Sequence, residues 1–377
     1  MLWCCQEAPI PPPLDQTIAL WEGESVAFLP DTVWPNDGTW NRYDAGRILM
    51  RPFVFPHCER RCSIDLEVTL RSAGDPWDKS GAVFALAGAD GRRFIDRLQD
   101  GIEADTTQYL GVMLDERGYP ALELMRFLTP FGAGHFSTHP KAESWRPVYV
   151  AKWEDEVRWQ RDLSAFQPWF DEADTLWIGV YIDTWTSKGY EIEGALHIKE
   201  SALECDLAPT HRIIPFWNTT RYTHDQREYN GFASAPLKTT LEGIGGRVSC
   251  GLITTGHGGH EGGDEFTPQL HQLAVDGDTL KSWTPWRDDC AAFRRFNPSS
   301  GSWMVDHLDG QERIASSDLS RSNWCPGSQV LPELIDLGYW EGGEHEISLS
   351  IPHAQLAGPD AFNFWNVSGY LMVESMD

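Results

Sequence analysis

The sequence predicts an all-β protein, and three features of the 377-residue chain carry that prediction. Apolar residues recur with a period of two rather than 3.6, which is typical of strands with one buried face. The 34 Gly and 24 Pro residues interrupt these runs at short intervals, as turns between strands do. The one stretch long enough for a sizeable helix is 150–163, where Trp159 and several acidic residues make the pattern ambiguous. We therefore expect strands arranged as sandwiches or jelly rolls.

Four segments show the alternation clearly, in chain order 64–70, 176–185, 192–198 and 347–351. In the second of them, one face of the expected strand carries Leu176, Ile178, Val180 and Ile182. The opposite face carries Trp177, Tyr181, Asp183 and Trp185. This pattern predicts a strand with an aliphatic core face and a second face that is aromatic and acidic.

The length of the chain exceeds the size at which one hydrophobic core usually stops growing, so two domains are expected. A boundary fits at 207–212, where the strand pattern is interrupted and Pro209 suits a linker. We predict a leader with a Pro-rich segment over 1–20, an N-terminal domain over 21–207 and a C-terminal domain over 208–377.

Charge and composition limit the partners. With 56 Asp and Glu against 30 Lys and Arg, the net charge is −26. Such a surface repels phosphate backbones, so nucleic acid is not expected as a partner. No apolar run approaches the ~20 residues of a membrane span. The chain has 18 Trp residues, and indole faces stack well on sugar rings, although packing inside sandwiches accounts for many of them.

The eight Cys residues include no CxxC pair, so a zinc ribbon is not expected. Their even number is compatible with disulfides and with an exported protein.

Four polar segments could carry chemistry, namely 74–81, 182–191, 254–266 and 320–327. Three of them place a carboxylate beside an aromatic residue at a strand end or in a Gly-rich loop. Carboxylates near apolar rings tend to have raised pKa values and can act as general acids or bases. Each carboxylate taken alone is more often a turn former or a solvated side chain.

The loop that contains His257 and His260 is a weak metal signal, because two histidines in a flexible Gly-rich loop lack the helical frame of zinc proteases. A polar loop that lines a cleft is the better interpretation. The sequence also lacks a phosphate-binding Gly loop and a nucleophile elbow. We expect neither a metal nor another cofactor.

In this order, the four segments resemble those of the peptide:N-glycosidase F family. Trp77-Asp78 is similar to that family's Trp-Asp segment, and Asp183-Thr-Trp185 to its second acidic segment. The third family segment is matched by Asp264-Glu265-Phe266, with His271 on a corresponding histidine. The run 321–327 resembles the family's late Arg and its Trp-Cys-Pro-Gly turn.

The sequence departs from the family pattern at a few places. Asp183 stands where the family has a glutamate, which is one methylene longer. Lys79 stands where an arginine is expected, so the charge is kept and the bidentate fork is lost. Two family disulfides have no counterparts here, and residues 131–170 align poorly.

The resemblance implies two tandem antiparallel jelly-roll β-sandwich domains packed side by side, with the active site between them. It implies an amidase that hydrolyses the bond between Asn and the first N-acetylglucosamine of N-linked glycans, which releases the intact glycan and converts Asn to Asp. The catalytic residues implied are Asp78 as the principal acid/base, Glu265 and Asp183. The substrate-binding residues implied are Trp77, Lys79, Trp185, His257, Arg321 and Trp324. A disulfide between Cys290 and Cys325 is also implied.

The partners expected are N-glycosylated proteins or glycopeptides as substrates, and we expect a monomer. A secreted or periplasmic location of bacterial type fits, with a lipid anchor near the N-terminus left open. Two alternatives remain. One is a non-catalytic carbohydrate-binding jelly-roll protein. The other is a copper-dependent monooxygenase-like protein, for which clustered HxH pairs are expected and none occurs.

Overall fold

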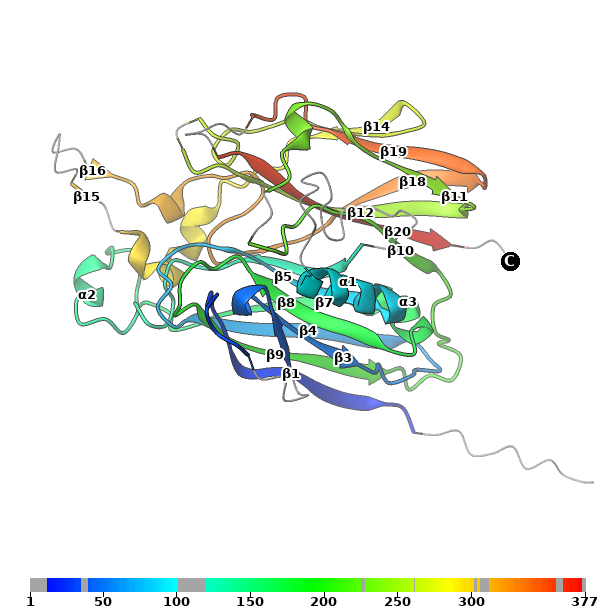
Figure 1. Ribbon diagram of the computed structural model, residues 1–377, viewed down its shortest axis with the longest axis horizontal. Coiled ribbons are helices and arrows are strands. Elements are labelled where there is room, and N and C mark those ends of the chain that lie inside the picture. The colour runs from blue at the N-terminus through cyan, green and yellow to red at the C-terminus, as the bar shows by residue number, and fades with distance from the viewer. Residues whose placement is uncertain are drawn as a thin grey trace, which may run out of the picture.

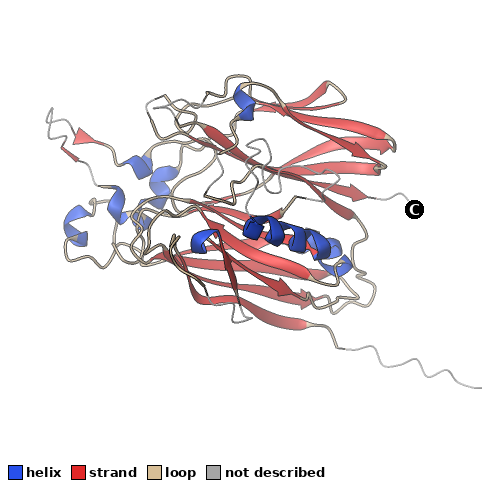
Figure 2. Ribbon diagram, viewed as in Figure 1, coloured by secondary structure: helices blue, strands red, loops and turns tan. Residues whose placement is uncertain are grey.

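The computed structural model describes residues 12–34, 40–100, 120–224, 228–260, 262–301, 304–305, 312–356 and 362–374. Antiparallel strands dominate, which confirms the all-β prediction (Figure 2). They form two sandwiches that lie against each other, with the N-terminal one below in Figure 1. Among the described residues, no helix is long and apolar enough to cross a membrane.

The N-terminal sandwich has the strand order of a jelly roll. One sheet runs β1-β9-β4-β7 and the other β17-β6-β5-β8-β3-β2. The first sheet contains β1 (Asp15–Val26), β9 (Tyr190–Glu200), β4 (Cys62–Ser72) and β7 (Val157–Asp162). The second contains β6 (Leu122–Leu128), β5 (Ser80–Ala87), β8 (Leu176–Ile182), β3 (Ile48–Phe53), β2 (Asn41–Tyr43) and β17 (Gln329–Val330). Without β2 and β17, eight strands alternate between the sheets in the double Greek-key order.

The C-terminal sandwich repeats this order, with sheets β10-β20-β12-β18 and β11-β19-β13-β14. The first contains β10 (Arg212–Asn218), β20 (Phe364–Glu374), β12 (Gly245–His257) and β18 (Glu333–Glu341). The second contains β11 (Leu237–Glu242), β19 (Glu344–Ser350), β13 (His271–Val275) and β14 (Asp278–Trp283). A short hairpin joins β15 (Met304–Val305) and β16 (Glu312–Arg313). Each sandwich has its own apolar core.

Helical elements are few in the described parts of the chain. They are α1 (Gly88–Asp100), α2 (Ala142–Trp145), α3 (Gln167–Glu172) and six 3-10 turns at Asp44–Gly46, Ser164–Phe166, Gly231–Ala233, Cys290–Phe296, Pro298–Ser300 and Ser316–Asp318. The helix considered at 150–163 is wrong, because strand β7 lies there and alternates buried Val157 and Trp159 with exposed Arg158 and Gln160.

Strand β8 confirms half of its predicted pattern. Its residues Leu176, Ile178, Val180 and Ile182 belong to the N-terminal core. The aromatic face is also covered, because Trp177 and Tyr181 pack in a separate cluster with Phe94 and Ile95 of α1. At Gly91 a Cβ atom would lie 1.9 Å from the Trp177 ring, so this glycine lets the helix approach the sheet.

A buried ion pair on β6 makes hydrogen bonds across to the C-terminal sandwich. Arg126 of β6 binds Glu123 through Nε–Oε1 (2.8 Å) and Nη2–Oε2 (2.6 Å) contacts. Its Nη1 also donates to the Asn366 carbonyl oxygen on β20 (2.7 Å), and Ser368 donates to Glu123 (2.5 Å). Strand β17 of the C-terminal half pairs with β6 at the edge of the N-terminal sheet. Removing one partner from a buried pair of this kind leaves a charge unpaired, which is costly. The hydrogen bonds that this pair makes to β20 therefore hold the two sandwiches in one relative position.

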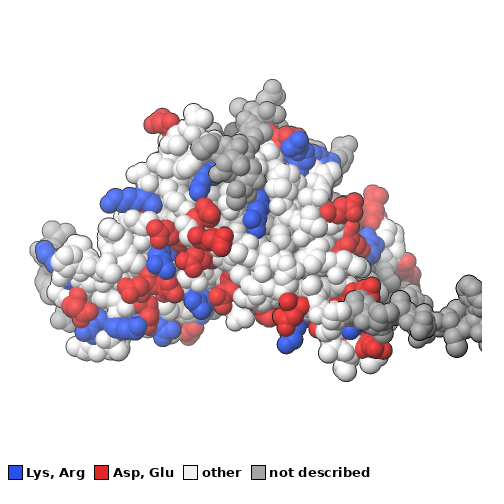
Figure 3. All heavy atoms as spheres, turned by 90° about the horizontal axis from the view of Figure 1, so that it is seen from below, with Lys and Arg blue, Asp and Glu red and all other residues white. Residues whose placement is uncertain are grey.

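The charge of the chain is spread over the surface. On the face seen in Figure 3, acidic and basic side chains are interspersed rather than separated into large patches. Ion pairs such as Arg71–Glu156 and Arg158–Glu67 contribute to this mixture.

Candidate active site

A pocket of about 300 Å³ lies where loops of the two sandwiches meet. The chain up to β9 contributes Asp78, Lys79, Ser80, Leu128, Asp183 and Trp185 to its lining. The chain from β10 onward contributes Arg221, Glu228, His257, Gly258, Gly259, Glu265, Trp324, Phe362 and Phe364. Most of the residues singled out in the sequence are therefore brought together in one place, between the domains.

The loop before β5 positions Asp78. The buried Asp75 accepts a hydrogen bond from the Trp77 backbone N–H (3.0 Å) and another from the Thr184 hydroxyl (2.7 Å). The Tyr190 hydroxyl donates to the Trp77 carbonyl oxygen (2.6 Å). Because an Asp side chain that bonds the backbone two residues on stabilises a turn, this loop is rigid at the point where Asp78 projects.

Arg321 connects Asp78 with Glu265. Its Nε donates to Glu265 Oε1 (2.8 Å), and its Nη2 lies 3.7 Å from Asp78 Oδ2. Arg321 is 1% exposed, and its guanidinium lies against the rings of Phe266 (5.0 Å) and Trp324 (4.8 Å). One buried cation is thus shared by two carboxylates that come from different domains.

These contacts place the two carboxylates close enough to influence each other. Since a guanidinium group is planar and compact, Glu265 Oε1 and Asp78 Oδ2 lie within about 9 Å of each other. Burial raises the pKa of Asp78, against the opposing charges of Arg321 and Lys79. Burial, together with the charge of Asp78, raises the pKa of Glu265 to about 7 although Arg321 lowers it. The pair can therefore hold a proton near neutral pH.

Asp183 has a different environment. Its Oδ1 accepts from Arg47 Nη1 (2.5 Å), Arg221 Nη2 (2.9 Å) and the Tyr181 hydroxyl (3.0 Å). The indole of Trp185 lies 4.8 Å from the Arg47 guanidinium and 5.2 Å from that of Arg221. A carboxylate that bridges two guanidiniums holds the neighbouring side chains in place.

His257 forms part of the pocket wall. Its ring stacks on Phe364 (4.6 Å between centroids) and on Trp324 (5.5 Å). Burial, with the nearby charges of Arg126 and Arg321, lowers the pKa of His257 to about 3, so the imidazole is neutral. Among the described residues, no three His, Cys, Asp or Glu side chains gather so that they could hold a metal ion.

The remaining sequence candidates lie around this centre. Trp77 is 57% exposed and does not line the pocket, whereas Trp185 is 44% exposed and does. Lys79 lines the pocket beside Asp78. Trp324 is buried and donates from Nε1 to the Gly256 carbonyl oxygen (2.8 Å). By contrast, His271 lies outside the pocket, buried against Trp283 and Trp365.

The Cys290–Cys325 disulfide is present, with an S–S distance of 1.98 Å. It fixes the turn that follows Trp324 to the 3-10 helix Cys290–Phe296. A second disulfide joins Cys58 and Cys62.

Several residues of the pocket were not found from the sequence. Arg221, Glu228, Phe362 and Phe364 line it, and Arg47 lies behind Asp183. Arg221 pairs with Glu228 (2.5 Å) and reaches Asp183 across 38 positions of the sequence. No motif or spacing marks these residues, because only the tertiary fold brings them to the site.

Comparison with known proteins gives matches over most of the chain. The family model described as Peptide-N-glycosidase F, N terminal, matches residues 17–198, and that described as Peptide-N-glycosidase F, C terminal, matches residues 228–372. No curated protein sequence matches.

Solved structures are also similar. The structure of PNGF-II is 29% identical, with a TM-score of 0.81, and the match covers 96% of this chain and 66% of that one. This chain thus spans slightly less than two thirds of the length of PNGF-II. PNGase F, a glycosylasparaginase from Flavobacterium meningosepticum, is 15% identical with a TM-score of 0.62, and the match covers 96% of both chains. At this low identity, the match to PNGase F shows the shared fold alone.

Proposed function

Because the chain belongs to the peptide-N-glycosidase F family, we propose that it is an amidase that removes intact N-linked glycans from proteins. The bond hydrolysed is the amide between Asn and the first N-acetylglucosamine. The observation that carries the proposal is the meeting of Asp78 and Glu265, from two domains, on the single buried cation Arg321. Neither sandwich by itself contains this arrangement.

In the proposed reaction, a water molecule attacks the carbonyl carbon of the Asn side chain. Asp78 takes a proton from this water and later gives a proton to the departing nitrogen, so that the amide C–N bond breaks. The products are an Asp side chain and a glycosylamine. The raised pKa of Asp78 suits a group that must both accept and donate a proton.

Glu265 and Arg321 assist in different ways. We assign Glu265 to hold the attacking water or the substrate amide, since its second oxygen is not used by Arg321. We assign the guanidinium of Arg321 to stabilising the negative charge that develops on the carbonyl oxygen, because it lies between Asp78 and Glu265. No proton transfer is assigned to His257, because its lowered pKa keeps the ring neutral.

Asp183 is assigned a positioning role. It holds Arg47, Arg221 and, through them, the indole of Trp185 at the mouth of the pocket. The flat apolar faces of Trp185 and Phe364 suit the faces of sugar rings. We assign Trp77 and Lys79 to binding the substrate as it enters. Trp77 lies on the exposed rim, and Lys79 lies in the pocket beside Asp78.

The remaining proposals concern the protein as a whole. The leader predicted over 1–20 overlaps β1, so we assign 15–207 and 208–377 to the two domains. We expect a monomer, because both halves of the site lie in one chain. Export to an oxidising compartment fits the two disulfides.

One assay on a denatured N-glycosylated protein tests the function. The wild-type chain should release the intact glycan and leave Asp at the attachment site. A non-catalytic carbohydrate-binding protein would bind the glycoprotein and leave it unchanged. Asp78→Asn is the matched control, because it keeps the shape of the side chain and removes the proton exchange.

A further inference from the structure

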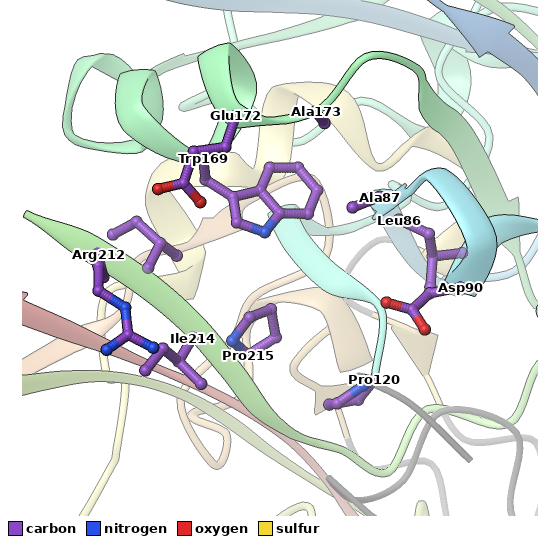
Figure 4. Close-up of a pocket in the computed structure, with 11 residues that line it drawn as sticks. Leu86, Ala87, Asp90, Pro120, Trp169, Glu172, Ala173, Arg212, Ile214 and Pro215 are labelled. Atoms are coloured by element: carbon purple, nitrogen blue, oxygen red, sulfur yellow. The ribbon is translucent and has the colours of Figure 1, made fainter. Parts of the chain in front are cut away.

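A second pocket, of about 240 Å³, lies between the N-terminal sandwich and β10 of the C-terminal one (Figure 4). Strand β5 connects the two places, since Ser80 lines the candidate active site and Leu86 lines the second pocket. At roughly 3.3 Å per strand residue, the two pockets are on the order of 20 Å apart. The second pocket, here called the seam pocket, is therefore separate from the proposed catalytic centre.

The seam pocket contains an indole whose N–H lacks a partner. Trp169 of α3 is 9% exposed, and Figure 4 shows its ring projecting into the space between Arg212 and Asp90. None of the described residues accepts a hydrogen bond from Trp169 Nε1. Trp169 Nε1 is not buried, so it meets solvent in the pocket. It can therefore donate a hydrogen bond to a ligand that enters.

The polar groups around Trp169 include both donors and acceptors. Glu172 and Arg212 border the pocket and make no hydrogen bond or ion pair with other described residues. Asp90 lies on the opposite side and is paired with Arg93 (2.5 Å). Leu86 supplies apolar surface in the same pocket.

This combination selects a chemical class. Two carboxylates disfavour an anionic ligand, and Arg212 disfavours a cationic one. Hydroxyl groups both donate and accept hydrogen bonds. They can accept from Trp169 Nε1 and Arg212, and they can donate to Glu172 and Asp90. A pyranose also has apolar ring faces that fit an aromatic side chain.

We propose that the seam pocket is a second saccharide-binding site that takes one neutral pyranose ring of a glycan. The proposal rests on the proposed function only for the choice of an N-linked glycan as the source of that ring. A site of this kind would hold a branch of the substrate, or a neighbouring glycan, away from the bond that is hydrolysed.

Calorimetric titration of the full chain with a free, neutral high-mannose glycan tests the proposal. The free glycan has no Asn amide, so it is not consumed. The wild-type protein should bind it at two classes of site. Trp169→Phe keeps the apolar ring and removes the N–H, and it should weaken one class about three- to tenfold, as expected for one lost hydrogen bond. Arg212→Gln should weaken the same class.

The control is Arg247→Gln, which changes an exposed arginine that pairs with Asp336, away from both pockets. This variant should keep both classes of site. A single class in the wild type, or a second class unchanged in both Trp169→Phe and Arg212→Gln, would overturn the proposal. Turnover of a short glycopeptide, measured in parallel, tests the proposed function separately. It should stay within about twofold in these variants, because neither residue lines the catalytic pocket.

Discussion

Two carboxylate clusters meet in one pocket, and they differ in how many hydrogen bonds their carboxylates accept from neighbouring side chains. In the first cluster, Asp78 and Glu265 share the single guanidinium of Arg321, and the pKa values of both acids are raised. In the second, one oxygen of Asp183 receives hydrogen bonds from two guanidiniums and a phenol.

The difference separates two functions that acidic residues of one site can have. A buried carboxylate that makes few hydrogen bonds to cations can retain a proton near neutral pH. A carboxylate that accepts charge-assisted hydrogen bonds from several side chains holds those side chains in place. The first cluster is therefore suited to chemistry, and the second to holding the shape of the pocket.

The largest effect is expected for Asp78→Asn. General acid–base groups usually contribute ~10²–10⁴-fold to the rate, so turnover should fall by that amount while the melting temperature stays close to that of the wild type. Steady-state kinetics on a glycopeptide and thermal unfolding measure the two quantities. A loss of less than roughly tenfold would mean that Asp78 only shapes its turn.

A smaller loss of rate is expected for Glu265→Gln, about 10- to 100-fold, which is the value of a charge-assisted hydrogen bond. The variant should also lose a titration near pH 7 from its rate profile. Because the folded pKa of about 7 lies above the ordinary 4.5, Glu265 stabilises the fold below pH 4.5, and this contribution is lost as the pH rises to 7. Unfolding of Glu265→Gln should lack that loss. An unchanged pH profile would assign the titration to another group.

Asp183→Asn should reverse the pattern seen for Asp78. The neutral amide removes the carboxylate that bridges Arg47 and Arg221, although these keep Asp44 and Glu228 as partners. The free energy of unfolding should therefore fall by about 2 kcal/mol, less than for a fully buried pair because the side chain is partly exposed. Turnover should fall only about three- to tenfold, with the pH profile unchanged. Denaturant unfolding and steady-state kinetics measure these two effects. A loss of rate equal to that of Asp78→Asn would show that Asp183 takes part in the chemistry and does not only position other side chains.

The smallest effect is expected for Arg47→Lys. Arg221 and Tyr181 still donate to Asp183 in this variant, so turnover should stay within about threefold. A rise in KM without a change in kcat would show that Arg47 acts through the Trp185 indole. A fall in kcat of the size seen for Glu265→Gln would place Arg47 in the chemistry instead.

The sequence predicted the parts of the fold and site that local patterns encode. Alternation marked β8, and the jelly-roll order followed from the family resemblance. The segments around Asp78, Asp183, Glu265 and Arg321 stood out because each combines charged and aromatic residues in a short turn.

The parts that the sequence did not reveal depend on tertiary contacts. The short alternation of β7 was hidden by its charged residues, although Trp159 stacks on Phe127 (4.6 Å) in the core. Helix α1 was missed because Gly88 and Gly91 lower helix propensity, yet Gly91 is needed where the helix meets Trp177. Arg221 and Glu228 carry no motif, so their place beside Asp183 follows only from the packing of the two sandwiches.

The most direct test of the central claim uses a glycopeptide with one N-linked glycan in water enriched in oxygen-18. If Asp78 and Glu265 hydrolyse the amide, mass spectrometry will show a glycan-free peptide that carries Asp with one heavy oxygen, and the Asp78→Asn variant will leave the glycopeptide intact. A peptide that keeps one N-acetylglucosamine on an unlabelled Asn, or equal conversion by the variant, would contradict it.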